Sequence, residues 1–169
     1  VAQCLPMLNG AELVVCDGNL SAAALQTLAQ RCTRPLYMDP VSTSWAREVE
    51  PYLAAVDTIK PNRQEMEGVA GMPIHTEAEL DAACDAVLAR GVRRVFVSLG
   101  RAGIYYKGPE GALHGRSHGF DGCVNATGAG DATMAGIVRA SVLGYDALRT
   151  VQFALGAGLA AISCDDTIN

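Results

Sequence analysis

Short apolar runs alternate along this chain with longer segments whose apolar residues recur every three or four positions. Runs of the first kind, which stop at a polar residue, glycine or proline, predict buried strands. The expected strands are 12–17, 36–39, 57–60 and 94–98, followed by an antiparallel pair at 103–107 and 112–116. The second kind predicts helices at 21–29, 45–56, 63–69, 77–88, 130–143 and 147–163, and 1–10 resembles the end of a helix. This alternation predicts an α/β fold with a mainly parallel sheet covered on both faces.

Polar and glycine residues gather where the expected strands end, which is the edge where such sheets bind ligands. They are Asp17, Asn19, Asp39, Ser42, Asn62, Glu65, Ser98 and Gly100. Turn or cap propensity also accounts for each of them singly. Their presence after four different strands favours one shared site.

Composition narrows the possible partners. The 169 residues are 50% hydrophobic, enough for one substantial core, and we expect one unit with no internal repeat or linker. Thirteen basic residues stand against eighteen acidic ones, and the lysines are Lys60 and Lys107. This acidic balance argues against nucleic acid or an anionic membrane as the main partner. No apolar run reaches the roughly 18 residues that a membrane span needs.

Cysteine and histidine placement gives little sign of a metal centre. The six cysteines are scattered without a C-x-x-C pair, which predicts reduced, buried residues of a cytoplasmic protein. They are Cys4, Cys16, Cys32, Cys84, Cys123 and Cys164. His114 and His118 have a spacing compatible with zinc, but no Cys or acidic residue lies near them in the sequence, so surface histidines are favoured.

The segment Asn125–Ala132 is a loop of small residues that closes on one carboxylate before an apolar, helix-forming stretch, 132–142. The first N–H groups of a helix are unpaired and carry partial positive charge, and glycine lets an anion approach them. Gly128 and Gly130 suit a transferring phosphate, and Asp131 suits a base for the attacking hydroxyl. An ordinary glycine turn capped by Asp explains these residues equally well when they are taken alone.

Three segments together resemble the ribokinase-like (PfkB-type) family of sugar and nucleoside kinases. They are Lys60-Pro-Asn-Arg-Gln-Glu65, Ser98-Leu-Gly-Arg-Ala-Gly103 and Ala126-Thr-Gly-Ala-Gly-Asp131. Their order and spacing match the family, and the resemblance covers nearly the whole chain. It implies a ribokinase-like three-layer αβα fold that uses ATP and Mg²⁺.

The resemblance also implies roles for individual residues. Asp131 would be the catalytic base, and Gly128, Ala129 and Gly130 would form the anion hole for the γ-phosphate. Asn62 and Glu65 would order Mg²⁺, although a helix cap completed by a capping box explains them too. The residues implied at the nucleotide site are Asn62, Ser98, Gly100, Gly103, Thr127, Ala157 and Gly158. Small residues of the last helix, Ala154 included, would leave room for adenine, but alone they indicate only close helix packing.

One departure from the family pattern bears on substrate and on potassium. Many members carry Asp where this chain has Asn125, in a region that helps to hold a monovalent cation, so potassium dependence stays open. The segments 124–131, 39–42 and 17–21 look most like the pseudouridine kinase branch, which phosphorylates a 5′-hydroxyl. A kinase of a free sugar such as ribose or fructose is the alternative.

Family members are much longer, and their N-terminal half supplies the first strands, a sugar-binding glycine pair and a lid that often mediates dimerisation. Nothing in this chain resembles that half. We therefore expect 1–169 to be the C-terminal nucleotide-binding and catalytic portion of a longer parent, and we expect this fragment to be prone to association. The resemblance is compatible with a homodimer of the parent, and the oligomeric state stays open. A non-catalytic nucleotide-binding module is the alternative from another functional class.

Overall fold

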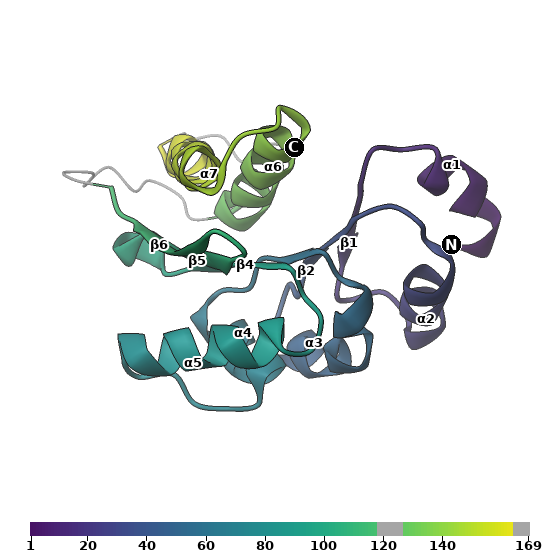
Figure 1. The fold of residues 1–169 in the computed structure, drawn as a ribbon, viewed down its shortest axis with the longest axis horizontal. Coiled ribbons are helices and arrows are strands. Elements are labelled where there is room, and N and C mark those ends of the chain that lie inside the picture. The colour runs from purple at the N-terminus through teal and green to yellow at the C-terminus, as the bar shows by residue number, and fades with distance from the viewer. Residues whose placement is uncertain (118–126, 164–169) are drawn as a thin grey trace. The chain divides into compact units, whose positions relative to one another are not determined.

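A computed structural model describes residues 1–117 and 127–163 (Figure 1). The chain divides into two compact units. The first consists of Val1–Val97 with Lys107–Gly111, and the second of Ser98–Tyr106 with the described residues from Ala112 onward. Within these residues, none of the helices is long and apolar enough to cross a membrane.

The described strands form one sheet in the order β1-β2-β3-β4-β5-β6, and the first three pairings are parallel. Their bounds are β1 Val14–Asp17, β2 Leu36–Asp39, β3 Thr58–Ile59, β4 Arg94–Ser98, β5 Ile104–Gly108 and β6 Gly111–Gly115. All four residues of β2 are buried, which is why its sequence shows no polar alternation. The link between β5 and β6 is only Pro109 and Glu110, and so short a link joins antiparallel strands. The predicted strands are confirmed.

The helices of the first unit follow its strands. They are α1 Leu5–Asn9, preceded by a 3₁₀ helix at Ala2–Cys4, α2 Ala22–Arg31, α3 Thr43–Glu48, α4 Arg63–Ala70 and α5 Glu77–Leu88. Side-chain caps set several starts: Ser21 Oγ accepts the Ala24 N–H at 3.3 Å, and Thr76 Oγ1 accepts the Glu79 N–H at 3.2 Å. Consecutive helices pack together in Figure 1, α3 against α4 and α4 against α5.

The continuous helix predicted at 45–56 is wrong. The α-helix ends at Glu48, and a separate 3₁₀ helix covers Glu50–Ala55. Pro51 is the physical reason, because it has no N–H to donate four residues back and its ring clashes with that carbonyl. Val49 and Leu53 are both buried, so the two pieces still pack on the core that the apolar pattern predicts.

The second unit contains a 3₁₀ turn at Gly100–Ala102 and two long helices, α6 Ala129–Val142 and α7 Ala147–Ile162. These two helices pack against each other at small residues. A Cβ at Gly136 would lie 2.8 Å from Cα of Ala154, closer than real Cβ atoms approach. The small side chains of this pair therefore allow the helices to approach closely.

Four of the cysteines lie in the described residues, and all four are free thiols. Cys16 and Cys84 are buried as predicted, and burial raises the pKa of each to about 12. Cys32 is half-buried. Cys4 is exposed, so the prediction of burial is wrong for that residue. Cys123 and Cys164 lie outside the described residues.

Candidate functional site

Charged residues meet at the carboxyl ends of the parallel strands in the first unit. The register pairs Asp17 with Asp39, and it pairs Met38 with Ile59, so that Lys60 follows β3 beside the end of β2. Lys60 Nζ lies 2.9 Å from Asp39 Oδ2, with the two side chains only 4% and 12% exposed. An ion pair this buried places a cation and an anion at the edge where α/β sheets bind ligands.

The backbone after Asp39 adopts a rare conformation. Val41 has φ of 68°, and among the described residues other than glycine it alone has a positive φ. The Ser42 N–H donates to the Pro40 carbonyl at 2.8 Å, which closes a three-residue turn around Val41. The Val41 N–H donates to Asp39 Oδ1 at 3.1 Å. A β-branched residue in this region is strained, and such strain concentrates at functional sites.

Asn62 and Glu65 form the predicted capping box at the start of α4. Asn62 Oδ1 accepts the Glu65 N–H at 2.9 Å, and Glu65 Oε2 accepts the Asn62 N–H at 2.8 Å. Glu65 is buried, and burial raises the pKa of its carboxyl, a rise to which the charge of Asp39 adds and which Lys60 opposes. The cap uses the carboxylate oxygen Oε2.

The donor set of the first unit fits Mg²⁺. No group of three His, Cys, Asp or Glu side chains within the described part of the chain forms a metal cage. Mg²⁺ does not require one, because it is commonly held by one or two carboxylates together with waters and substrate phosphates. Glu65 offers a carboxylate oxygen, and exposed Asn62 offers an amide oxygen that can contact a metal-bound water.

In the second unit, β4 is followed by a glycine turn. The Leu99 N–H donates to the Gly103 carbonyl at 2.8 Å, and the Gly103 N–H donates to the Gly100 carbonyl at 3.0 Å. Gly103 has φ of 93°, and a Cβ there would lie 2.0 Å from the Gly115 carbonyl oxygen. Gly100, with φ of 59°, has open space around it, and Ser98 is half-buried. Gly103 therefore shapes the turn, while Gly100 leaves backbone accessible.

The start of α6 has the features predicted for an anion site. Gly128 is the N-cap residue with φ of 82°, no side chain caps the helix, and a Cβ at Gly128 would meet nothing within 4 Å. Ala129, Gly130 and Asp131 form the first turn, and the Asp131 side chain is exposed. Thr127 precedes the helix in an exposed turn. The first amides of a long helix thus stand beside an accessible carboxylate. Asn125 and Ala126 lie outside the described residues.

Small residues near the end of α7 face α6. The position of a Cβ at Gly158 is 2.7 Å from Thr133 Oγ1, and the Ala157 Cβ lies 3.1 Å from the Cβ position of Gly136. Helix packing alone thus accounts for their size, and their role beside adenine stays a prediction.

His114 bonds to the Ala102 carbonyl oxygen at 2.9 Å and to Arg116 at 3.2 Å, so both of its ring nitrogens are occupied. This arrangement does not favour a zinc ligand; His118 lies outside the described residues.

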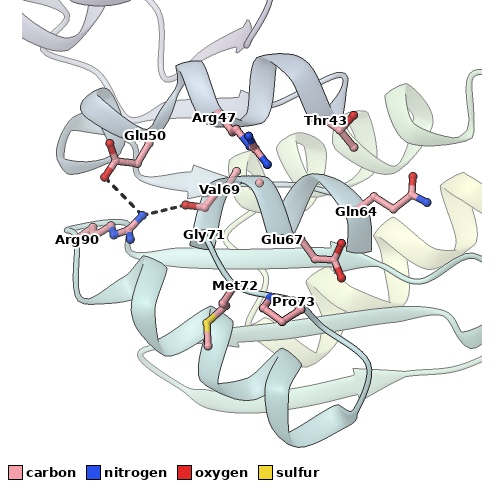
Figure 2. A pocket seen from close by; sticks show the side chains of 11 residues that line it. Thr43, Arg47, Glu50, Gln64, Glu67, Val69, Gly71, Met72, Pro73 and Arg90 are labelled. Carbon is pink, nitrogen blue, oxygen red and sulfur yellow. Dashed lines mark hydrogen bonds and ion pairs between the residues drawn. The ribbon is translucent and has the colours of Figure 1, made fainter.

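A cavity of about 800 Å³ lies elsewhere in the first unit, beside α3 and α4 (Figure 2). Arg90 and Glu67 on its wall hold the end of α4: Arg90 Nη1 donates to the Val69 carbonyl at 2.8 Å, and Glu67 Oε1 accepts the Ile74 N–H at 2.8 Å. Arg90 also lies 3.6 Å from Glu50. None of the residues predicted for the site lines this cavity, and Arg90 and Glu67 on its wall serve to fasten the fold.

A model of the pfkB family of carbohydrate kinases matches residues 7–169. The chain belongs to this family. It is 31% identical to pseudouridine kinase of Escherichia coli K12 over all of this chain and 54% of that protein. It is 30% identical to 1-phosphofructokinase of Haemophilus influenzae over 62% of this chain and 34% of that protein. The whole of this chain therefore matches only about half the length of the pseudouridine kinase.

Solved structures confirm the fold class of this pfkB chain. A candidate sugar kinase from Clostridium perfringens has a TM-score of 0.91 at 29% identity, with 99% of this chain and 53% of that one covered. Arabidopsis thaliana ribokinase complexed with ribose and ATP has a TM-score of 0.83 at 21% identity, with 98% and 54% covered. The predicted ribokinase-like three-layer α/β architecture is confirmed.

Sequence reasoning missed two features of this pfkB chain. Asp39 was singled out as a strand-end residue, but its pairing with Lys60 depends on the register of β2 and β3. The left-handed Val41 carries no local signal, because valine is among the residues least suited to that conformation. Lys60, at the end of the strand expected at 57–60, was the one available sign of a buried partner, because a buried lysine is almost always paired.

Proposed function

We propose that these 169 residues are the nucleotide-binding and catalytic portion of an ATP-dependent kinase that phosphorylates a hydroxymethyl group of a sugar or nucleoside. The observation that carries the proposal is the start of α6, where an uncapped helix with a left-handed Gly128 stands beside exposed Asp131. A helix end of this kind favours an anion whose charge grows in the transition state. Membership of the pfkB family supports it.

In the proposed reaction, the Asp131 carboxylate takes the proton of the acceptor hydroxyl as that oxygen bonds to the γ-phosphorus. The bond between the γ-phosphorus and the bridging oxygen breaks, and ADP leaves with that electron pair. The amides of Ala129 and Gly130 receive the equatorial oxygens of the phosphoryl group.

In the first unit, Glu65 and Asn62 order Mg²⁺, which when bound neutralises charge on the phosphates. Lys60 supplies a fixed positive charge for a phosphate oxygen. Ser98, Gly100, Gly103, Thr127, Ala157 and Gly158 are the proposed nucleotide contacts. The free, buried thiols Cys16 and Cys84 support a cytoplasmic location.

The acceptor that we propose is pseudouridine, at its 5′-hydroxyl. The 31% identity to a pseudouridine kinase over the whole chain supports this choice. The 30% identity to a 1-phosphofructokinase, over 62% of the chain, keeps a sugar or sugar phosphate as the second candidate. Asn125, the departure from the family pattern that leaves potassium dependence open, lies outside the described residues.

ATP consumption by the full-length parent tests this function with pseudouridine, uridine, ribose, fructose and fructose 1-phosphate as acceptors. We expect turnover with pseudouridine to exceed turnover with the other four. Asp131→Asn keeps size and nucleotide binding but removes the base, so kcat falls by about 10²- to 10⁴-fold. Turnover of none of these acceptors, or an Asp131→Asn variant as fast as wild type, would refute the proposal.

A further inference from the structure

The Asp39–Lys60 pair is poorly explained by stability alone. Burying two charges carries a desolvation penalty, and well-packed apolar residues in place of a buried pair are often as stable or more so. The pair is nonetheless among the most buried charged groups of the described chain, with Lys60 only 3% and Asp39 8% exposed as whole residues. A buried pair kept at the ligand-binding edge of a sheet therefore calls for a second explanation.

The surroundings of Asp39 hold its carboxylate in one orientation. Oδ2 contacts Lys60 Nζ at 2.9 Å, and Oδ1 accepts the Val41 N–H at 3.1 Å. The Asp39 carbonyl accepts the Gly18 N–H at 2.7 Å. A Cβ at Gly18 would lie 2.9 Å from the Pro40 carbonyl oxygen, so glycine there lets the β1 loop close on the turn. Each oxygen of the carboxylate thus has its own fixed donor.

The turn that follows Asp39 contains a strained backbone conformation at Val41. The Val41 N–H that donates to Asp39 belongs to the central residue of the three-residue turn, which has φ of 68°. Such strain persists where neighbouring contacts over-determine the backbone, most often at ligand clamps and active sites. Here the contacts around the turn include the bond from the Val41 N–H to the carboxylate that faces Lys60.

We propose, building on the function proposed above, that Asp39 is a positioning residue that holds the Lys60 ammonium for a phosphate oxygen of the nucleotide. An ammonium has three donor hydrogens, and Asp39 takes one of them. Glu65, five residues after Lys60 in the first turn of α4, lies within electrostatic reach of both Asp39 and Lys60. The ammonium therefore lies within electrostatic reach of the residue proposed to order Mg²⁺, and a positive charge there would suit the phosphates of a bound nucleotide.

A double-mutant cycle on the 169-residue chain tests this role. Asp39→Asn, Lys60→Gln and the double variant are compared for affinity toward Mg²⁺–AMP-PNP by calorimetry and for thermal midpoint by circular dichroism. Each single variant leaves an uncompensated buried group, so we expect its midpoint to fall. We expect affinity to fall by roughly ten- to a hundredfold in each, the range typical when a supporting residue of a binding site is lost.

The double variant separates positioning from packing. With both charges gone, its midpoint should return close to that of wild type, while its affinity should stay as low as that of Lys60→Gln alone. If the pair were purely structural, the double variant would regain both its affinity for Mg²⁺–AMP-PNP and its thermal midpoint. Asp81→Asn is the matched control, because Asp81 Oδ1 lies 2.7 Å from Lys107 Nζ in the same unit without being a strand-end residue. This control should bind as wild type does.

The outcomes distinguish this inference from the proposed function. If wild type binds the nucleotide and the double variant binds equally well, Asp39 has no positioning role and the proposed function stands. If the two single losses multiply in the double variant, Asp39 acts independently of Lys60, and the inference is overturned. If the wild-type chain itself does not bind Mg²⁺–AMP-PNP, the proposed nucleotide site fails, and the inference fails with it.

Discussion

Glu65→Gln separates the two roles that Glu65 is given. In wild type, Glu65 Oε2 accepts the Asn62 N–H at 2.8 Å. A glutamine oxygen can accept the same N–H, so the capping box survives in the variant. A broken cap would lower the free energy of unfolding by about 1 kcal/mol. Burial raises the pKa of Glu65, which means that the folded state disfavours the ionised form at any pH above that raised pKa. Without metal, we therefore expect the free energy of unfolding of Glu65→Gln to equal that of wild type or to exceed it slightly.

Nucleotide binding should respond in the opposite direction. A hydrogen bond or contact that involves a charged group contributes about 1.5–3 kcal/mol, which corresponds to roughly ten- to a hundredfold in affinity. Calorimetry with AMP-PNP should show that loss in the presence of Mg²⁺ and little loss in EDTA. Urea titration followed by circular dichroism provides the free energy of unfolding on the same samples.

The chain contains a second capping box that serves as the control. Glu79 on α5 accepts the Thr76 N–H at 2.9 Å and the His75 N–H at 2.6 Å, bonds that lower its pKa, and it is half-buried. Glu79→Gln should leave Mg²⁺-dependent binding unchanged. Equal binding by Glu65→Gln and wild type would refute the metal role, and a large loss of stability in Glu65→Gln would refute the reasoning about its cap.

Two further outcomes follow from backbone geometry and burial. Gly103→Ala introduces a Cβ 2.0 Å from the Gly115 carbonyl oxygen at φ of 93° and should lower the free energy of unfolding by about 2 kcal/mol or more in a urea titration. Gly100→Ala, at φ of 59° in open space, should cost about half as much, and equal costs would contradict the steric argument. Iodoacetamide at pH 8 should modify exposed Cys4 far faster than Cys84, whose pKa burial raises to about 12; comparable rates in peptide mass spectra would show that the core opens.

Local chemistry explains most of what the sequence predicted correctly. The Asn62 capping box and the run that forms β2 depend on residues close together in the chain, so their patterns are visible without the fold. The predicted helix at 45–56 failed because Pro51 outweighed a continuous apolar pattern. Burial of Cys4 failed because apolar sequence neighbours do not determine what packs over a side chain.

The candidate site was predictable only in part, for the same reason. Gly128 and Asp131 belong to one short motif, and their placement at a helix start follows from the motif itself. The Asp39–Lys60 pair joins two strands, and it depends on a register that no local pattern specifies. The left-handed Val41 conflicts with its own residue preference, and only tertiary contacts can impose such a conformation.

A crystal structure of the chain with Mg²⁺–AMP-PNP tests the central claim most directly, because the claim concerns where the γ-phosphate lies. The account predicts that its oxygens accept hydrogen bonds from the Ala129 and Gly130 amides, with the Asp131 carboxylate facing the γ-phosphorus. A γ-phosphate held by other residues, with the start of α6 left free of the nucleotide, would contradict it.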